Sequence, residues 1–323
     1  MLSTGAPPDW GSFDVVAPRP TARLPGISMA GFRQHVPAHA DITMVAHPSV
    51  TLLVDLSDSE CLVYDAHRQR GRGSVLIGLL PGDLRTGGPV GECLQIRLEP
   101  VAAAAVLGAS NELSGTVVAL EDFWGRDAGR AEETLRAAGS WDERFAIAAE
   151  FLGRRLGTHP PVDPEVAHTW RRIRAGRGLM RVDGLADEVG WSRKRLSARS
   201  RSQLGITPKR VARLVRFDHA AHLLAAGHPA AGVAAESGYA DQSHLHREVR
   251  AFAGLTPAAV AVAPWLAIDH VAWPSSSPTR RRACDGKTEA VDQYPLLAQA
   301  PRGVAPPEVD STSAGSNGNP GPC

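Results

Sequence analysis

Two segments in the second half of this chain concentrate side chains that can bind nucleic acid. Residues 192–204 contain five lysine and arginine side chains, and residues 242–253 begin with glutamine, serine and histidine. Lysine and arginine can donate hydrogen bonds to guanine and to phosphates, and glutamine suits adenine. A cluster of charged residues is also typical of a solvated helix face. The interpretation therefore depends on the elements that hold these segments.

The sequence around both segments is a repeat. Residues 185–191 return as residues 233–239, at an offset of 48, and residues 204–208 return as residues 253–257, at an offset of 49. In each copy a glycine, which tolerates positive φ, follows a short helical pattern, and a second glycine ends a longer one. A Thr-Pro pair then opens the next helix as N-cap and first helical residue. Each copy is therefore predicted to be a helix-turn-helix unit, and two in tandem favour DNA binding.

The stretch between the units is predicted to be one helix over residues 208–226. Its apolar residues recur at helical spacing. A helix of this length would measure about 28 Å, and successive major-groove faces lie about 34 Å apart. Such a helix can hold two DNA-reading units on neighbouring turns of one DNA face.

Charge is distributed unevenly along the chain. Residues 166–262 contain 16 Lys and Arg against 7 Asp and Glu, whereas the whole chain has a formal net charge of +1. A basic segment on a near-neutral chain is typical of a nucleic-acid-binding module.

Residues 166–262 resemble the DNA-binding domain of the AraC/XylS family of bacterial transcription regulators. The motifs that carry the resemblance are Leu185-Ala186…Gly190-Trp191-Ser192…Leu196, the junction Gly205-Ile206-Thr207-Pro208, and Gly238-Tyr239-Ala240-Asp241-Gln242-Ser243-His244-Leu245-His246-Arg247…Gly254-Leu255-Thr256-Pro257. Residues 98–122 are similar, through a less specific pattern, to the regulatory half of some family members.

The resemblance implies that the second helix of each unit enters the major groove. The residues at the family's base-contacting positions, together with the adjacent Gln242, are Lys194, Ser197, Ala198, Gln242, Ser243, His246 and Arg247. The residues expected to hold phosphates are Arg193, Arg195, Arg199, Arg201 and Arg250. Ala198 offers only a methyl group, where many family members carry arginine.

Ser200 departs from the family pattern. It stands where the first unit usually has a buried aromatic residue, and Val249 stands at the equivalent place in the second unit. A serine there loses apolar burial and brings a hydroxyl that needs a partner. Ser200→Phe is therefore expected to stabilise the domain.

The whole chain is predicted to be an α+β multidomain protein. Short apolar runs broken by Gly, Pro and Asp predict strands, for example at residues 50–56, 61–64, 74–80 and 93–98. Helical patterns follow at residues 101–107, 131–137 and 141–156. The predicted organisation is a flexible leader (1–25), a cupin-like regulatory and dimerisation domain with helices (26–160), an all-α AraC-type DNA-binding domain with two helix-turn-helix motifs (161–263) and a disordered tail (264–323).

Family members often dimerise through helices like the one expected at residues 141–156, although this helix could equally pack only on its own β domain. A barrel mouth is a natural pocket for a small-molecule effector, but one sequence does not name its residues.

The sequence gives little support for a metal site, a cofactor or a membrane-spanning segment. His35, His39 and His47 invite a metal site, but the usual cupin spacing and its following glutamate are absent, so we expect neither a metal nor a cofactor. No apolar run approaches the 18 residues of a membrane span. Four scattered cysteines without metal spacing fit a reducing cytoplasm.

The sequence therefore predicts a cytoplasmic, non-enzymatic, sequence-specific transcription regulator. Its partners would be double-stranded DNA, a small-molecule effector, a second copy of the chain as homodimer, and RNA polymerase. One alternative is a cupin-type or DNA-repair enzyme with an appended DNA-binding module, although no nucleophile motif or paired carboxylates support it. Another is an architectural protein that binds DNA without strong sequence preference.

Overall fold

The computed structural model describes residues 13–19, 24–35, 39–57, 62–64, 69–79, 84–89, 91–108, 112–263, 266 and 272–273. Most of the predicted leader and tail lies outside these residues. None of the helices in the described ranges is both long and apolar enough to cross a membrane.

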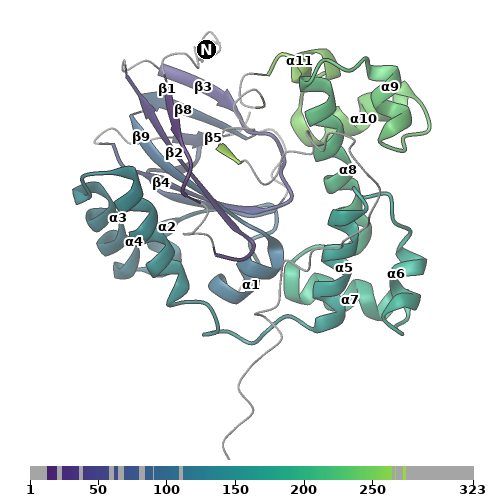
Figure 1. The fold of residues 1–323 in the computed structure, drawn as a ribbon, viewed down its shortest axis with the longest axis horizontal. Helices are drawn as coiled ribbons and strands as arrows, with labels where there is room; N and C mark the ends of the chain where they lie inside the picture. Colours follow the sequence, from purple (N-terminus) through teal and green to yellow (C-terminus); the bar gives the residue numbers. More distant parts are fainter. Residues whose placement is uncertain are drawn as a thin grey trace, which may run out of the picture. The chain divides into compact units, whose positions relative to one another are not determined.

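Two antiparallel sheets form the N-terminal part of the chain (Figure 1). The first has the strand order β1-β2-β9-β4-β7-β10, with bounds β1 Phe13–Val16, β2 Ile27–Gln34, β9 Glu92–Leu98, β4 Val50–Asp55, β7 Val75–Ile77 and β10 Val117–Ala119. The second has the order β3-β8-β5-β6, with bounds β3 His39–Thr43, β8 Arg85–Pro89, β5 Leu62–Tyr64 and β6 Gln69–Arg72. β1 lies within the segment for which the sequence predicts a flexible leader; it pairs antiparallel with β2.

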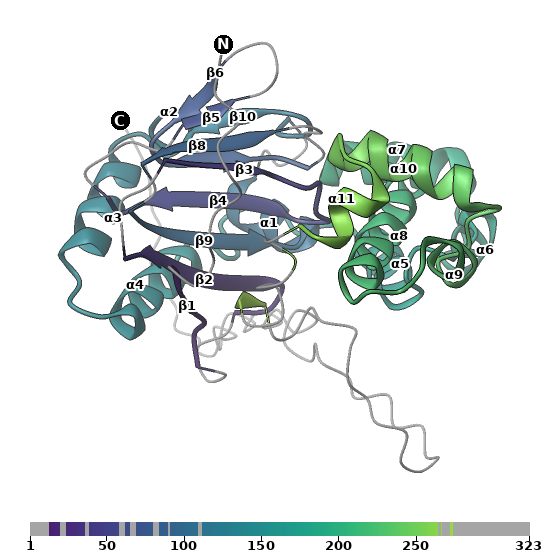
Figure 2. The same ribbon diagram turned by 90° about the horizontal axis from the view of Figure 1, so that it is seen from above.

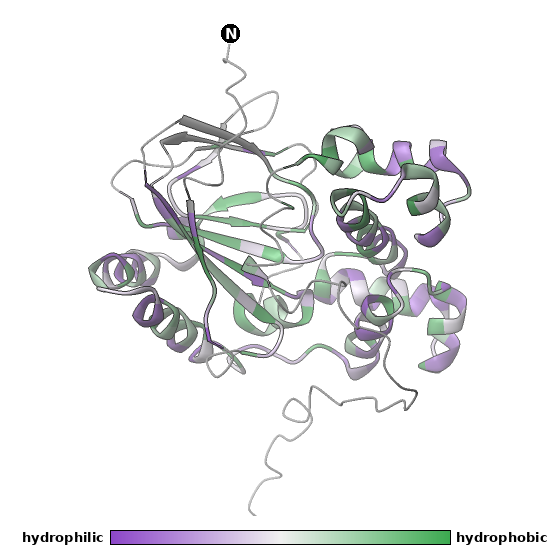
Figure 3. Ribbon diagram, turned by 45° about the horizontal axis from the view of Figure 1, so that its top comes forward, coloured by the Kyte–Doolittle hydropathy of each residue, from purple (hydrophilic) through white to green (hydrophobic). Residues whose placement is uncertain are grey.

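One face of the six-stranded sheet packs against helices. In the register of β4 and β9, Leu52 lies opposite Ile96, and Val54 lies opposite Leu94. These side chains share the main core with helices α1 (Pro100–Leu107), α2 (Leu120–Trp124), α3 (Arg126–Ala137) and α4 (Trp141–Gly153). Figure 2 shows β4, β9 and β2 side by side, and Figure 3 shows the central strands in the green of hydrophobic residues. The helix cover explains why Leu52 and Val54 of β4 are buried.

The other face of this sheet packs against the second sheet. Successive side chains of a strand point to opposite faces, so Leu53 and Ile77 lie on the face away from the helices. They form a separate buried cluster with Val63 of the second sheet and Leu84, which precedes β8. The result is two sheets packed face to face, with helices covering the outer surface of one of them.

Residues 164–261 fold into helices. Their bounds are α5 Pro164–Ala175, α6 Val182–Glu188, α7 Arg193–Leu204, α8 Pro208–Ala225, α9 Ala230–Glu236, α10 Gln242–Ala253 and α11 Pro257–Ala261. The long connecting helix is confirmed as α8, one residue shorter than predicted. Gly205 and Gly254 end α7 and α10 with φ of 71° and 66°. The predicted fold class, a β-rich N-terminal domain followed by an all-α domain with two helix-turn-helix units, is confirmed.

Three residues of the predicted tail are described. Leu266 is partly buried, and Ala272 and Trp273 are almost fully buried.

Candidate nucleic-acid interface

Helix α7 exposes one polar face and buries another. The Ser192 hydroxyl accepts a hydrogen bond from the backbone N–H of Arg195 and so caps the first turn. Every third or fourth residue along the inner side, namely Leu196, Ser200 and Leu204, is buried. The opposite side carries Lys194, Ser197, Ala198 and Arg201, all exposed except Ser197, which is half-buried. These four positions are spaced by three or four residues and therefore share one helix face.

Helix α10 repeats this arrangement. The Asp241 carboxylate accepts a hydrogen bond of 2.6 Å from the backbone N–H of His244. The inner side buries Leu245, Val249 and Phe252. The outer side exposes Ser243, His246, Arg247 and Arg250, each 49 positions after its counterpart in α7, and Gln242 is exposed beside them. All seven predicted base-contacting residues therefore lie at or beside the outward faces of two equivalent helices.

The five arginines predicted to contact phosphates differ in their intramolecular partners. Arg201 and Arg250 are exposed on the outward faces just described. Arg193 is ion-paired with Asp183 at 2.9 Å, and Arg195 lies over the ring of Trp191, 4.2 Å from its centroid. Both remain at the solvent-exposed surface, so they can still reach DNA, but each also holds part of its own helix-turn-helix unit.

Arg199 is tied to Asp163 by two hydrogen bonds of 2.7 and 2.9 Å. Asp163 precedes the first residue of α5, and Gln203 donates to the same carboxylate. These hydrogen bonds, above all that from Arg199, lower the pKa of Asp163. The pair joins α7 to the start of α5, so Arg199 has an intramolecular role that its position in a basic cluster did not reveal.

A second carboxylate fixes α6 against α5. Glu188 accepts hydrogen bonds from Arg172 at 2.9 and 3.0 Å, and His168 lies 3.1 Å from the same carboxylate. The bond from Arg172 is the main cause that lowers the pKa of Glu188 to about 2. Because α6 precedes α7 in its unit, this contact also helps to hold α7 in place.

Helix α8 holds both units through two arginines. Arg213 donates hydrogen bonds of 3.2 and 2.6 Å to the nearly buried carboxylate of Glu248 in α10. Arg216 donates to the carbonyl of Gly178, which precedes α6, at 3.1 Å. Its guanidinium also lies 5.6 Å from the ring centroid of Tyr239, in the turn of the second unit. Neither arginine stands out in the sequence, because each acts through a partner 22 to 38 positions away.

Ser200 is only 3% exposed, and its hydroxyl has no hydrogen-bond partner among the described residues. It lines a small cavity with Trp170, Ile173 and Val211. Replacing Ser200 by alanine should stabilise the protein by about 1 kcal/mol, because an unpaired buried hydroxyl costs roughly 1–3 kcal/mol and alanine favours a helix. Thermal unfolding would measure this gain.

Ser202→Ala is the matched control, since Ser202 lies in the same helix but is exposed and donates to the carbonyl of Arg199. Equal melting temperatures for the two variants would contradict the expectation. Ser200→Ala is also a cleaner test than Ser200→Phe because it adds no volume.

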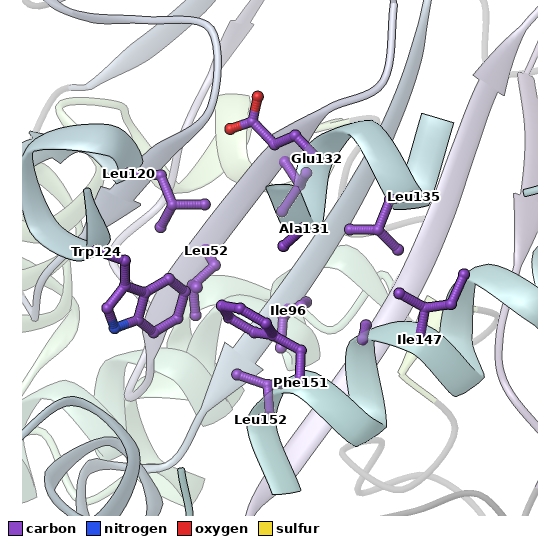
Figure 4. Close-up of a pocket in the computed structure, with 12 residues that line it drawn as sticks. Leu52, Ile96, Leu120, Trp124, Ala131, Glu132, Leu135, Ile147, Phe151 and Leu152 are labelled. Atoms are coloured by element: carbon purple, nitrogen blue, oxygen red, sulfur yellow. The ribbon is translucent and has the colours of Figure 1, made fainter. Parts of the chain in front are cut away.

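An apolar pocket lies in the N-terminal part, between the six-stranded sheet and helices α2–α4 (Figure 4). Leu52, Ile96, Trp124 and Phe151 are among its lining residues, and the carboxylate of Glu132 points away from them. Trp124 and Phe151 meet edge to face, with ring centroids 5.0 Å apart. Trp124 therefore packs within this apolar layer.

Of the three histidines considered as metal ligands, the two whose side chains are described each contact another polar side chain. His35 lies 3.0 Å from Asp14, and His47 lies 2.7 Å from the Ser49 hydroxyl, while nothing is described of the His39 side chain. Burial is the main cause that lowers the pKa of His47. In the part of the chain that is described, no three His, Cys, Asp or Glu side chains form a group able to hold a metal ion.

Residues 185–261 match a protein-family model described as a helix-turn-helix domain. No curated protein matches the sequence significantly. Among solved structures, the chain is similar to ToxT from Vibrio cholerae, with 11% sequence identity and a TM-score of 0.42, over 75% of this chain and 98% of that chain. It is also similar to the C-terminal domain of AraT, a response regulator from Geobacillus stearothermophilus, with 21% identity and a TM-score of 0.30, over 31% of this chain and 85% of that one.

The chain therefore carries a DNA-binding domain of the helix-turn-helix class. This domain is of the AraC type, as the motifs predict.

Proposed function

We propose that this protein is a sequence-specific transcription regulator that reads two adjacent major-groove segments with α7 and α10. The observation that supports this most strongly is the equivalence of the two outward faces. Lys194, Ser197, Ala198 and Arg201 in α7 correspond one by one, at an offset of 49, to Ser243, His246, Arg247 and Arg250 in α10. Neither face is needed to bury the core, so both are available to a partner.

The residue types on these faces suit DNA bases and phosphates. Lys194 and Arg247 can donate to guanine, Gln242 can pair with adenine, and the serines can bond to several bases. Arg201 and Arg250 would hold phosphates and fix the register of each helix. Because the two faces differ in residue type, the two groove segments would differ in sequence. The site would then be asymmetric within one monomer.

Helix α8 would set the distance between α7 and α10. Its 18 residues measure about 27 Å, somewhat less than the roughly 34 Å between successive major-groove faces. Arg213 ties α8 to α10, and Arg216 ties it to the turn before α6. A single straight helix with a polar contact to each unit would hold the two reading helices at a fixed separation.

In this proposal the N-terminal part of the chain regulates DNA binding. An effector bound to the β domain would alter the placement of the reading helices, and contacts from residues 100–160 would pair two monomers. Contact with RNA polymerase would give activation, and repression is equally compatible with the residues.

The test is selection of binding sites from random DNA by the purified full-length protein at physiological salt. We expect enrichment of an asymmetric motif about two helical turns long, or a pair of such motifs. An architectural protein would instead bind every sequence with similar affinity and a steep salt dependence. No enrichment by either the full-length chain or residues 161–263 would contradict the proposal.

A further inference from the structure

The six-stranded sheet has a second face, away from its helices, that carries an arginine together with polar and apolar residues. Along β2 and β9, Met29 lies opposite Ile96, and Gly31 lies opposite Leu94; these pairs contact the helix-covered core. The alternating residues therefore point to the other face. They are Ser28, Ala30 and Phe32 from β2, and Cys93, Gln95 and Arg97 from β9.

Trp273 lies on this face. It belongs to the segment that follows the DNA-binding domain, and its exposed fraction is only 2%. Together with Ala272 it forms one buried cluster with Ala30 and Phe32, bordered by Val15 and Cys93. A residue far along the chain thus completes the surface of a strand near the beginning.

Arg97 covers the indole ring. Its guanidinium carbon lies 4.1 Å from the ring centroid of Trp273, the distance of a cation–π contact. Trp is the best aromatic partner for such a contact, and the contact strengthens when it is shielded from water. The face therefore has the two features that recognise a flat aromatic ring, namely apolar walls and a cation above the ring plane.

We propose that this face is a binding site for planar aromatic compounds of indole size, and that Trp273 is its resident intramolecular ligand. A free aromatic compound would compete with Trp273 for this face and release its side chain. The release would give the β domain a route to influence DNA binding. This regulatory consequence rests on the proposed function, whereas the binding site does not.

The first test is binding of indole to full-length Trp273→Ala by calorimetry. Removing the side chain should leave a cavity of indole size, lined by the apolar residues of the cluster and by the Arg97 guanidinium. We expect the variant to bind indole at least about tenfold more tightly than the wild type, in which Trp273 competes. Trp273→Phe is the matched control, because it keeps a ring in the site and should bind indole weakly. Equal affinity of all three proteins would overturn the proposal.

A second measurement does not depend on the folding of the alanine variant. In full-length protein labelled with 5-fluorotryptophan, the fluorine resonance that disappears in Trp273→Phe belongs to Trp273. Adding indole should move this resonance towards its solvent-exposed position and leave the other resonances unchanged. A Trp273 resonance that stays fixed as indole is added would overturn the proposal. Neither measurement uses DNA, so failure here is separate from failure of site selection.

Discussion

Gly178→Ala is expected to lower the stability of the helical domain by about 3 kcal/mol. Gly178 has a φ of +73°, a conformation that costs other residues roughly 1–2 kcal/mol. An added Cβ would also lie 2.1 Å from the carbonyl oxygen of Ala212 and 2.8 Å from the backbone nitrogen of Arg216. Both atoms belong to the backbone of α8, which cannot rotate away as a side chain could, and overpacking of this kind costs about 1–3 kcal/mol.

The same position also accepts the hydrogen bond from Arg216. A shift of the turn to relieve the clash would weaken that bond as well. Thermal unfolding of the full-length protein would measure the loss. Gly190→Ala is the matched control, since Gly190 has a φ of +66° but open space where the Cβ would lie. It should cost only about 1–2 kcal/mol. An equal loss in both variants would show that close packing against α8 has no effect.

Arg247→Ala is expected to weaken binding to the selected DNA site by about 10- to 100-fold, corresponding to roughly 1–3 kcal/mol. Arg247 is exposed on the outward face of α10. Its loss should therefore leave the melting temperature unchanged, so that the effect on DNA is separate from folding. Because arginine discriminates guanine, the preference at one base pair should relax. Titrations against the selected site and single-base variants of it would measure both effects.

Arg250→Ala is the control from the same face of α10. As a proposed phosphate contact, Arg250 should contribute equally to every DNA sequence. Its loss should reduce affinity without changing base preference and should lower the slope of log affinity against log salt by about one. The assignment of Arg247 to a base would be wrong if both variants lost affinity uniformly and kept their base preferences.

The helical domain was predictable because its signals are local. A glycine that must adopt positive φ, a serine or aspartate that caps a helix, and an apolar residue every third or fourth position act within a few residues of one another. The repeat at an offset of 49 could therefore be recognised as two units, and the outward faces of α7 and α10 followed from helical periodicity. The strands at residues 50–55 and 92–98 were predictable from apolar runs for the same reason.

Other features depend on residues that are distant in sequence, and only the tertiary structure decided them. Arg199 lies in a basic cluster typical of phosphate contacts, yet Asp163, 36 positions earlier, holds it. β1 is a strand because β2 offers it an edge, and Trp273 is buried because β2 and β9 form a face that accepts it. Gly178 is constrained by α8 rather than by its own neighbours. Local sequence determines where the helices begin and end, whereas packing determines which charges pair and which surfaces remain free. The amino-acid sequence by itself therefore determined the class of this protein, and the tertiary structure decided which of its arginines also hold the domain together.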